Sequence, residues 1–188
     1  MSKLLPTDLV DELVVHEISL EQWVRLFEAL NAADVRYIVV GGLAVNAHGY
    51  QRLTHDIDLC LEMREENVRA ALTALTRLGY RPMLPVDSLD FADPVKRAEW
   101  VSKRNMEVFS LVSEEHRNPA VDLFATVPFD FGVEYELTMN AEIAPGVHVK
   151  FAALSTLIAM KETTGRARDE DDIRHMRMIL EAGDHDER

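Results

Sequence analysis

The sequence predicts an α/β (α+β) fold, in which a mixed β-sheet is flanked by helices and followed by a small helical C-terminal part. Three observations predict this class. A β-branched apolar run, Val35–Val40, ends in two glycines, and a second apolar run begins at Asp56. Two stretches with apolar residues at three- to four-residue spacing, from Ala153 to Thr164 and from Asp169 to Leu180, close the chain.

The helices are predicted from apolar spacing and from residues that start or end helices. Between Thr7 and Asn31 the spacing indicates two helical pieces, the second capped by Ser19. A short helix is expected over Leu43–His48, after the glycines. A longer one is expected over Glu65–Leu78, where the next residue is a glycine that can end it.

The remaining strands are predicted from short apolar or alternating runs. They are expected at Asp56–Leu61, Tyr80–Val86, Met106–Val112, Ala120–Thr126, Tyr135–Ile143 and Val147–Phe151. The segments Ser88–Glu99 and Phe129–Val133 show no such pattern, and we expect them to be irregular.

Length and composition indicate one globular unit. The chain has 188 residues and an apolar fraction of 47%, which is sufficient for one core. No linker long enough to separate two domains is visible. We therefore expect a single domain over 1–188, with an N-terminal helical segment (1–31), a mixed-sheet core (32–151) and C-terminal helices (152–183).

The charge and the apolar pattern limit the classes of partner. The net charge is −13, from 20 basic and 33 acidic residues, which argues against broad binding to nucleic-acid duplexes but leaves a local basic groove open. No apolar run reaches the ~18 residues of a membrane span, and no signal-peptide pattern is present. One cysteine, Cys60, cannot form an internal disulfide. We expect a cytoplasmic protein that does not bind membranes.

One pattern of residues in the sequence indicates a chemical function. Gly41 and Gly42 end the first apolar run, and Asp56 and Asp58 open the second. Because side chains alternate along a strand, the two carboxylates point the same way, roughly 6–7 Å apart. They repel each other unless a cation lies between them, and Mg²⁺ is commonly held by one or two carboxylates plus phosphates. Since a glycine turn lets backbone approach a phosphate, the pattern indicates metal-assisted nucleotidyl transfer.

A third carboxylate, Asp122, lies inside the apolar run Val121–Phe124. A charge among apolar strand residues costs free energy unless it is paired or binds a metal. In two-metal transfer reactions the ions stabilise both the attacking and the leaving oxygens. Three carboxylates commonly suffice to hold such ions, and one of them can accept the proton of the nucleophile. The alternative is that Asp122 only forms a hydrogen bond at the end of a strand.

The run from Gly41 to Val45, together with Arg52-Leu53-Thr54-His55-Asp56-Ile57-Asp58, resembles the motif of the DNA polymerase β-like nucleotidyltransferase superfamily. It is most similar to the small bacterial type, which includes abortive-infection toxins and antibiotic nucleotidyltransferases. The similarity is close from Val35 to Glu62 and moderate from Leu154 to Leu180. It implies a nucleotidyltransferase-like mixed sheet with the metal site on one face.

The resemblance also implies residues that bind the nucleotide. Gly41 and Gly42 correspond to the glycines that lie against the triphosphate. Arg52 and Thr54 correspond to residues just before the metal-binding strand, where a guanidinium and a hydroxyl can hold phosphate oxygens. Lys161 corresponds to a lysine on the first C-terminal helix, which either reaches the triphosphate or braces the site.

The metal site is implied in the same way. Asp56 and Asp58 correspond to the two metal ligands, and Asp122 corresponds to the third carboxylate, a metal ligand and candidate general base. The implied cofactor is Mg²⁺, with two ions bound and Mn²⁺ as a substitute.

The function that we expect is Mg²⁺-dependent transfer of NMP from an NTP, such as ATP, to an acceptor. The acceptor is a tRNA, a protein or a small hydroxylated compound. One version is a toxin of a toxin–antitoxin pair, which implies an antitoxin partner. The alternative is a catalytically inactive member that binds a nucleotide or a partner protein. Because all three carboxylates are present, the active enzyme is favoured.

Other phosphate-handling and metal sites lack support. His48 and His55 are not accompanied by a Cys or His cluster with zinc-ligand spacing, and His48 is expected to pack or cap the short helix. The sequence contains neither a P-loop nor a Gly-x-Gly-x-x-Gly motif.

A small basic patch surrounds Trp100, flanked by Lys96, Arg97, Lys103 and Arg104. We expect these residues to form a solvated helix face. A nucleic-acid contact is the alternative.

Overall fold

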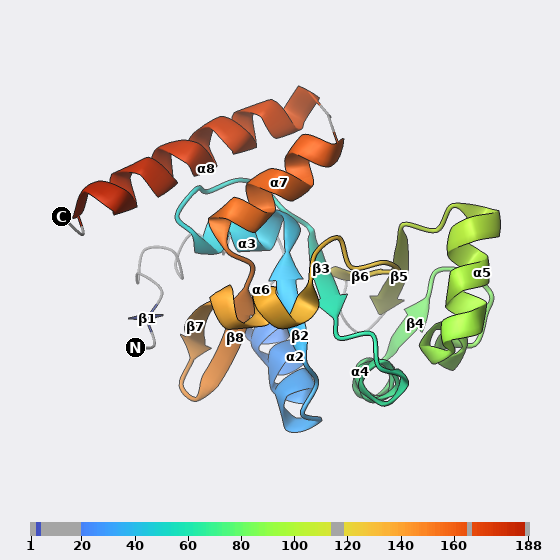
Figure 1. Ribbon diagram of the computed structural model, residues 1–188. Coiled ribbons are helices and arrows are strands. Elements are labelled where there is room, and N and C mark those ends of the chain that lie inside the picture. Colours follow the sequence, from blue (N-terminus) through green and yellow to red (C-terminus); the bar gives the residue numbers. More distant parts are fainter. Residues whose placement is uncertain (1–2, 5–19, 114–118, 165–166, 187–188) are drawn as a thin grey trace.

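The computed structural model describes residues 3–4, 20–113, 119–164 and 167–186, and a mixed β-sheet lies at its centre (Figure 1). The strand order is β1-β7-β8-β2-β3-β6-β5-β4. The strands span Lys3–Leu4 (β1), Tyr37–Val40 (β2), Asp56–Leu61 (β3), Tyr80–Pro82 (β4), Val108–Ser113 (β5), Ala120–Phe124 (β6), Met139–Ala144 (β7) and Val147–Phe151 (β8). The predicted fold class is therefore confirmed.

The helices are distributed along the whole described chain. They span Leu20–Ala32 (α2), Gly41–Ala47 (α3), Glu65–Arg77 (α4), Ser88–Ala92 (η1, a 3₁₀ helix), Pro94–Arg104 (α5), Phe131–Leu137 (α6), Leu154–Thr164 (α7) and Ala167–Asp186 (α8). The first helical piece expected after Thr7 lies outside the described residues. Within the described ranges, every helix is too short or too polar to cross a membrane.

The two central strands are those predicted from the glycine and aspartate runs. β3 covers the predicted range from Asp56 to Leu61. β2 begins two residues later than predicted, because Val35 still donates its N–H to the carbonyl of Leu30 in α2. β2 runs antiparallel to β3, and β3 runs parallel to β6.

Helices cover both faces of the sheet. The ring of Tyr37 in β2 stacks on Phe27 of α2 at 5.8 Å between centroids, and α4 contacts α2, so these helices share one face. Side chains alternate along β2, so Val40 and its strand partner Asp58 point to the opposite face. There α3 contacts β3 and α7, and α8 lies across α7 (Figure 1).

The expectation that Ser88–Glu99 is irregular is wrong, because η1 and most of α5 lie there. Asp93 caps α5, and its Oδ1 accepts the N–H groups of Val95 at 2.8 Å and Lys96 at 3.3 Å. The following Pro94 fits the first turn of a helix. α5 is mostly polar, so its apolar spacing was too weak to predict it.

The expectation of a loop at Phe129–Val133 is also wrong, because α6 begins at Phe131 and takes the start of the predicted strand Tyr135–Ile143. Tertiary contacts stabilise this short helix. Glu134 is only 4% exposed, and its carboxylate accepts the N–H of Ala153 at 2.8 Å and the hydroxyl of Thr156 at 2.6 Å. It thereby caps the start of α7, which places that helix over the sheet.

Candidate active site

Three carboxylates gather on the face of the sheet that α3 and α7 cover. Asp56 and Asp58 are two residues apart on β3, and Asp122 on β6 pairs in register with Asp58. Burial, followed by the charges of Asp122 and Asp56, raises the pKa of Asp58 to about 7. Burial and the charge of Asp122 also raise the pKa of Asp56, against the opposing effect of His55. The three side chains therefore form one cluster of negative charge.

The donor set suits a divalent cation that prefers oxygen, such as Mg²⁺ or Mn²⁺. A bound cation would offset the burial and the carboxylate repulsion that raise the pKa of Asp58. Over the part of the chain that the structure describes, no group of three or more acidic, histidine or cysteine side chains lies close enough together to hold a metal ion without further ligands. An incomplete set of protein ligands is consistent with Mg²⁺, which is usually held by one or two carboxylates together with the phosphates of a substrate.

The raised pKa of Asp58 predicts that the metal-free protein loses stability as the pH rises. The ordinary pKa of this carboxyl is 3.8 and its pKa in the folded protein is about 7, so folding favours the neutral form. The stabilisation is fully present below the ordinary pKa and is lost as the pH rises through the folded value. In a chelating buffer, we expect the melting temperature to fall between about pH 4 and pH 7.

Asp58→Asn should remove most of this decrease, because asparagine does not ionise. Thermal unfolding of both proteins across the pH range measures it. An equally steep decrease in Asp58→Asn would assign the pH dependence to other groups.

The two glycines make room for neighbouring side chains. Gly41 has φ +64°, and a Cβ added there would lie 2.0 Å from Oδ2 of Asp58. A Cβ at Gly42 would lie 2.6 Å from Oγ1 of Thr54 and 2.9 Å from Nη2 of Arg52. All three distances are below 3.0 Å, which real Cβ atoms essentially never show, so larger residues would displace side chains of the candidate site.

The loop between α3 and β3 carries Arg52 and Thr54, and α3 holds it in place. The side chain of Asn46 accepts the N–H of Arg52 at 3.0 Å and donates to its carbonyl at 2.9 Å. Oγ1 of Thr54 donates to the carbonyl of Asp56 at 3.4 Å. The sequence-predicted phosphate ligands are therefore fixed directly before the carboxylate strand.

Lys161 on α7 lies in a buried ionic cluster. Its side chain is 13% exposed, and its Nζ is 2.8 Å from Oδ1 of Asp169 and 2.6 Å from Oδ2 of Asp172. Asp172 also binds Nη1 of Arg52, at 2.5 Å. Arg52 and Lys161 both act to lower the pKa of Asp58, so the structure brings these two cations into the electrostatic field of the carboxylates.

The sequence analysis gave neither Asn46 nor Asp172 a role in the site. A signal for Asp172 was present, because positions 169, 172 and 176 follow helical spacing and share one face of α8. Asp169, Asp172 and Met176 are all buried, so that face is acidic as well as apolar. Acids on the buried face of a helix predict an ion pair in the interior. Asn46 offers no comparable signal.

Two other sequence features do not join the site. His48 packs as expected, with Nε2 at 2.8 Å from the carbonyl oxygen of Ala152. The basic residues of α5 are largely engaged with their neighbours. Arg97 is buried and donates to the carbonyl of Phe91 at 2.7 Å, and Lys96 and Lys103 pair with acids.

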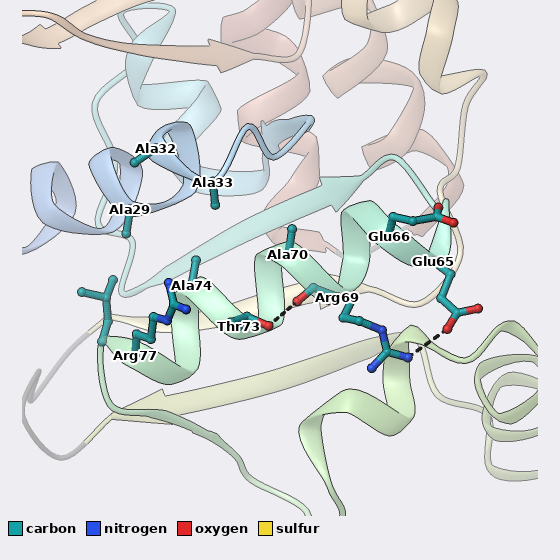
Figure 2. A pocket seen from close by; sticks show the side chains of 11 residues that line it. Ala29, Ala32, Ala33, Glu65, Glu66, Arg69, Ala70, Thr73, Ala74 and Arg77 are labelled. Atoms are coloured by element: carbon teal, nitrogen blue, oxygen red, sulfur yellow. Dashed lines mark hydrogen bonds and ion pairs between the residues drawn. The ribbon is translucent and has the colours of Figure 1, made fainter.

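A cavity of about 770 Å³ lies between α2 and α4, where Figure 2 shows small side chains of the two helices facing each other. Its lining includes Ala29, Ala33 and Ala70, with the ion pair between Arg69 and Glu65 at one end. Both helices cover the face of the sheet opposite Asp58. The cavity is therefore separate from the carboxylate cluster.

Comparison with known proteins bears on the fold. No family model matches the sequence, and no curated protein is significantly similar to it. Solved structures do match, and they show that the chain shares their fold. The resemblance inferred from the glycine and aspartate motif is thus confirmed at the level of the fold.

Two of these structures are antibiotic-modifying enzymes. ANT(2″)-Ia, solved in complex with adenylyl-2″-tobramycin, has a TM-score of 0.55 and 14% identity, covering 88% of this chain and 91% of that chain. The lincosamide antibiotic adenylyltransferase LnuA, solved with lincomycin bound, has a TM-score of 0.54 and 13% identity, covering 87% and 99%. Identities this low show a shared fold alone.

Proposed function

We propose that this protein is a Mg²⁺-dependent nucleotidyltransferase that moves NMP from an NTP to a hydroxyl group of an acceptor. The observation that carries the proposal is the cluster of Asp56, Asp58 and Asp122 on one face of the sheet, with the pKa of Asp58 raised to about 7. Such a cluster is expected where carboxylates hold a divalent cation. The shared fold with two adenylyltransferases supports the same reaction class.

Each group has a defined task in this proposal. Asp56, Asp58 and Asp122 would hold the metal ions, which supply stabilisation of the charge on the attacking and leaving oxygens. Asp122 accepts the proton of the acceptor hydroxyl. The acceptor oxygen bonds to the α-phosphorus, the bond from that phosphorus to its bridging oxygen breaks, and pyrophosphate leaves with the electron pair. Arg52 and Lys161 orient the phosphate oxygens.

A small hydroxylated compound is the acceptor that we favour. Both structural neighbours are named as adenylyltransferases of antibiotics or contain an adenylylated one. The net charge of −13 and the pairing of Lys96 with Asp90 and Lys103 with Glu99 leave α5 poorly suited to RNA. The second class of acceptor that the sequence resemblance implies is a tRNA or a protein. In that case the enzyme would be a toxin with an antitoxin partner.

Labelling with α-³²P nucleotides tests the proposal. The full chain is incubated with Mg²⁺ and each NTP in the presence of an aminoglycoside and lincosamide panel, total tRNA or a whole-cell lysate. We expect label on a small hydroxylated compound, with no label in excess EDTA and recovery on adding Mg²⁺ or Mn²⁺. Label on tRNA or protein would instead support the toxin. NTP binding without any labelling would favour the inactive member that binds a nucleotide, and the absence of both labelling and metal-dependent NTP binding would favour the inactive member that binds a partner protein.

A further inference from the structure

One buried carboxylate joins the two cations of the candidate site. Oδ2 of Asp172, on α8, is 2.5 Å from Nη1 of Arg52 and 2.6 Å from Nζ of Lys161. The side chain of Asp172 is 6% exposed, so these contacts are largely shielded from water. Charge-assisted hydrogen bonds in such surroundings are among the strongest in proteins. Asp172 therefore fixes a loop residue and an α7 residue relative to each other.

Without Asp172, the two cations would have another partner. The carboxylates of Asp58, Asp56 and Asp122 form the nearby acidic cluster, and Arg52 and Lys161 both lie close enough to act on Asp58. The guanidinium of Arg52 also lies against Gly42, next to the glycine that packs on Asp58. Lys161 would keep its ion pair with Asp169, but Arg52 would lose its partner. Attraction would draw Arg52 onto these carboxylates, where it would compete with a metal ion.

The loop that carries Arg52 has additional contacts with α8. The hydroxyl of Tyr50 donates to Oδ2 of Asp171 at 2.8 Å, and its ring stacks on His175 at 4.1 Å between centroids. Figure 1 shows this loop passing beneath α8 on its way from α3 to β3. Two residues of the loop, Tyr50 and Arg52, thus contact α8, and of these two contacts the one with Asp172 holds a cation of the site.

We propose that Asp172 is a positioning residue, which holds Arg52 and Lys161 side by side for the triphosphate and away from the metal carboxylates. The inference rests on the proposed function and deepens it. Asp172 touches neither the nucleotide nor the metal in this role and acts through the two cations. Because Nη1 of Arg52 is the atom bound, the remaining donors of the guanidinium are available to orient a phosphate.

Binding of inorganic tripolyphosphate with Mg²⁺ tests this role, because that probe carries the phosphate chain without a base. Isothermal calorimetry compares the full-length wild type with Asp172→Asn, Asp172→Glu and Glu162→Gln. The last is a matched control, since Glu162 pairs with Arg177 at 2.5 Å and also joins α7 to α8, but does not pair with Arg52 or Lys161. Mn²⁺ binding without phosphate, followed by electron paramagnetic resonance, is measured in parallel.

We expect Asp172→Asn to weaken tripolyphosphate binding roughly tenfold to a hundredfold and to weaken Mn²⁺ binding as well. Asp172→Glu should recover most of this affinity, because it restores the charge. Glu162→Gln should bind both probes like the wild type. Unchanged or tighter tripolyphosphate binding by folded Asp172→Asn would overturn the inference while leaving the proposed function intact. No binding by the wild type would overturn both.

Loss of a buried charge partner can also impair folding, so a second comparison is included. Arg52→Gln and the double variant Arg52→Gln/Asp172→Asn are measured with the same probe. If Asp172 acts largely through Arg52, Asp172→Asn should cost much less tripolyphosphate affinity in the Arg52→Gln variant than in the wild type. A further loss of a full tenfold or more in the double variant would contradict the positioning role.

Discussion

Asp122→Asn is expected to reduce nucleotidyl transfer by at least about a thousandfold while leaving the protein folded, because one preorganised charge of the site is removed. Asparagine has nearly the same shape, and Asp122 lies opposite Asp58 in a regular parallel strand pair. The amide would be a weaker metal ligand and would not accept the proton of the acceptor hydroxyl. The charge of Asp122 raises the pKa of Asp58, so its removal should also stabilise the metal-free protein near pH 8.

A loss of activity combined with a gain in stability separates catalysis from folding. Transfer is measured as release of labelled pyrophosphate at saturating NTP, and stability as the melting temperature in EDTA. Asp130→Asn is the matched control. Asp130 caps α6 by accepting the N–H of Val133 at 3.0 Å, and asparagine is an equally good cap, so transfer should be unchanged. Transfer by Asp122→Asn at the rate of the wild type would show that the third carboxylate is misassigned.

The parts of the fold that the sequence predicted well are those that local patterns determine. β3 was predicted at both ends, because an apolar run opened by two aspartates leaves little choice of register. α4 begins at the predicted Glu65, and Leu78 follows its last residue as the C-cap. In contrast, α6 depends on the buried contacts of Glu134 with the start of α7. Those contacts join residues far apart in sequence, and no local pattern reports them.

The residues of the site divide in the same way, because local spacing predicts some of them and tertiary packing determines the contacts of the others. Asp56, Asp58 and the glycines were found from spacing within the single segment from β2 to β3, and the structure brings Asp122 to them through the register of β3 and β6. The partner of Arg52 could not be predicted in this way. Asp172 lies on the last helix, and its contact requires the packing of α8 on α7 and of the loop beneath it. Spacing identifies residues on one element, whereas ion pairs between elements depend on the tertiary structure.

Gly41→Ala is expected to lower transfer by roughly a hundredfold or more, since a displacement of about 1 Å at a catalytic group can have that effect. The new Cβ would lie 2.0 Å from Oδ2 and 2.7 Å from Cγ of Asp58, so the carboxylate must move. The substitution also places alanine at φ +64°, a left-handed conformation that costs about 1–2 kcal/mol. The melting temperature should therefore fall by roughly 2–8 °C.

Gly49→Ala separates the effect of backbone strain from the effect of displacing the Asp58 carboxylate. Gly49 also has a positive φ, +100°, but a Cβ there would meet nothing within 4 Å. This variant should lose at least comparable stability from backbone strain and keep the transfer rate of the wild type, measured well below its melting temperature. Gly41→Ala should lose both, and its Mn²⁺ affinity should fall with its activity. If Gly41→Ala instead transferred nucleotide as fast as Gly49→Ala, the close approach of Gly41 to Asp58 would have no part in catalysis, and the glycine would serve the turn alone.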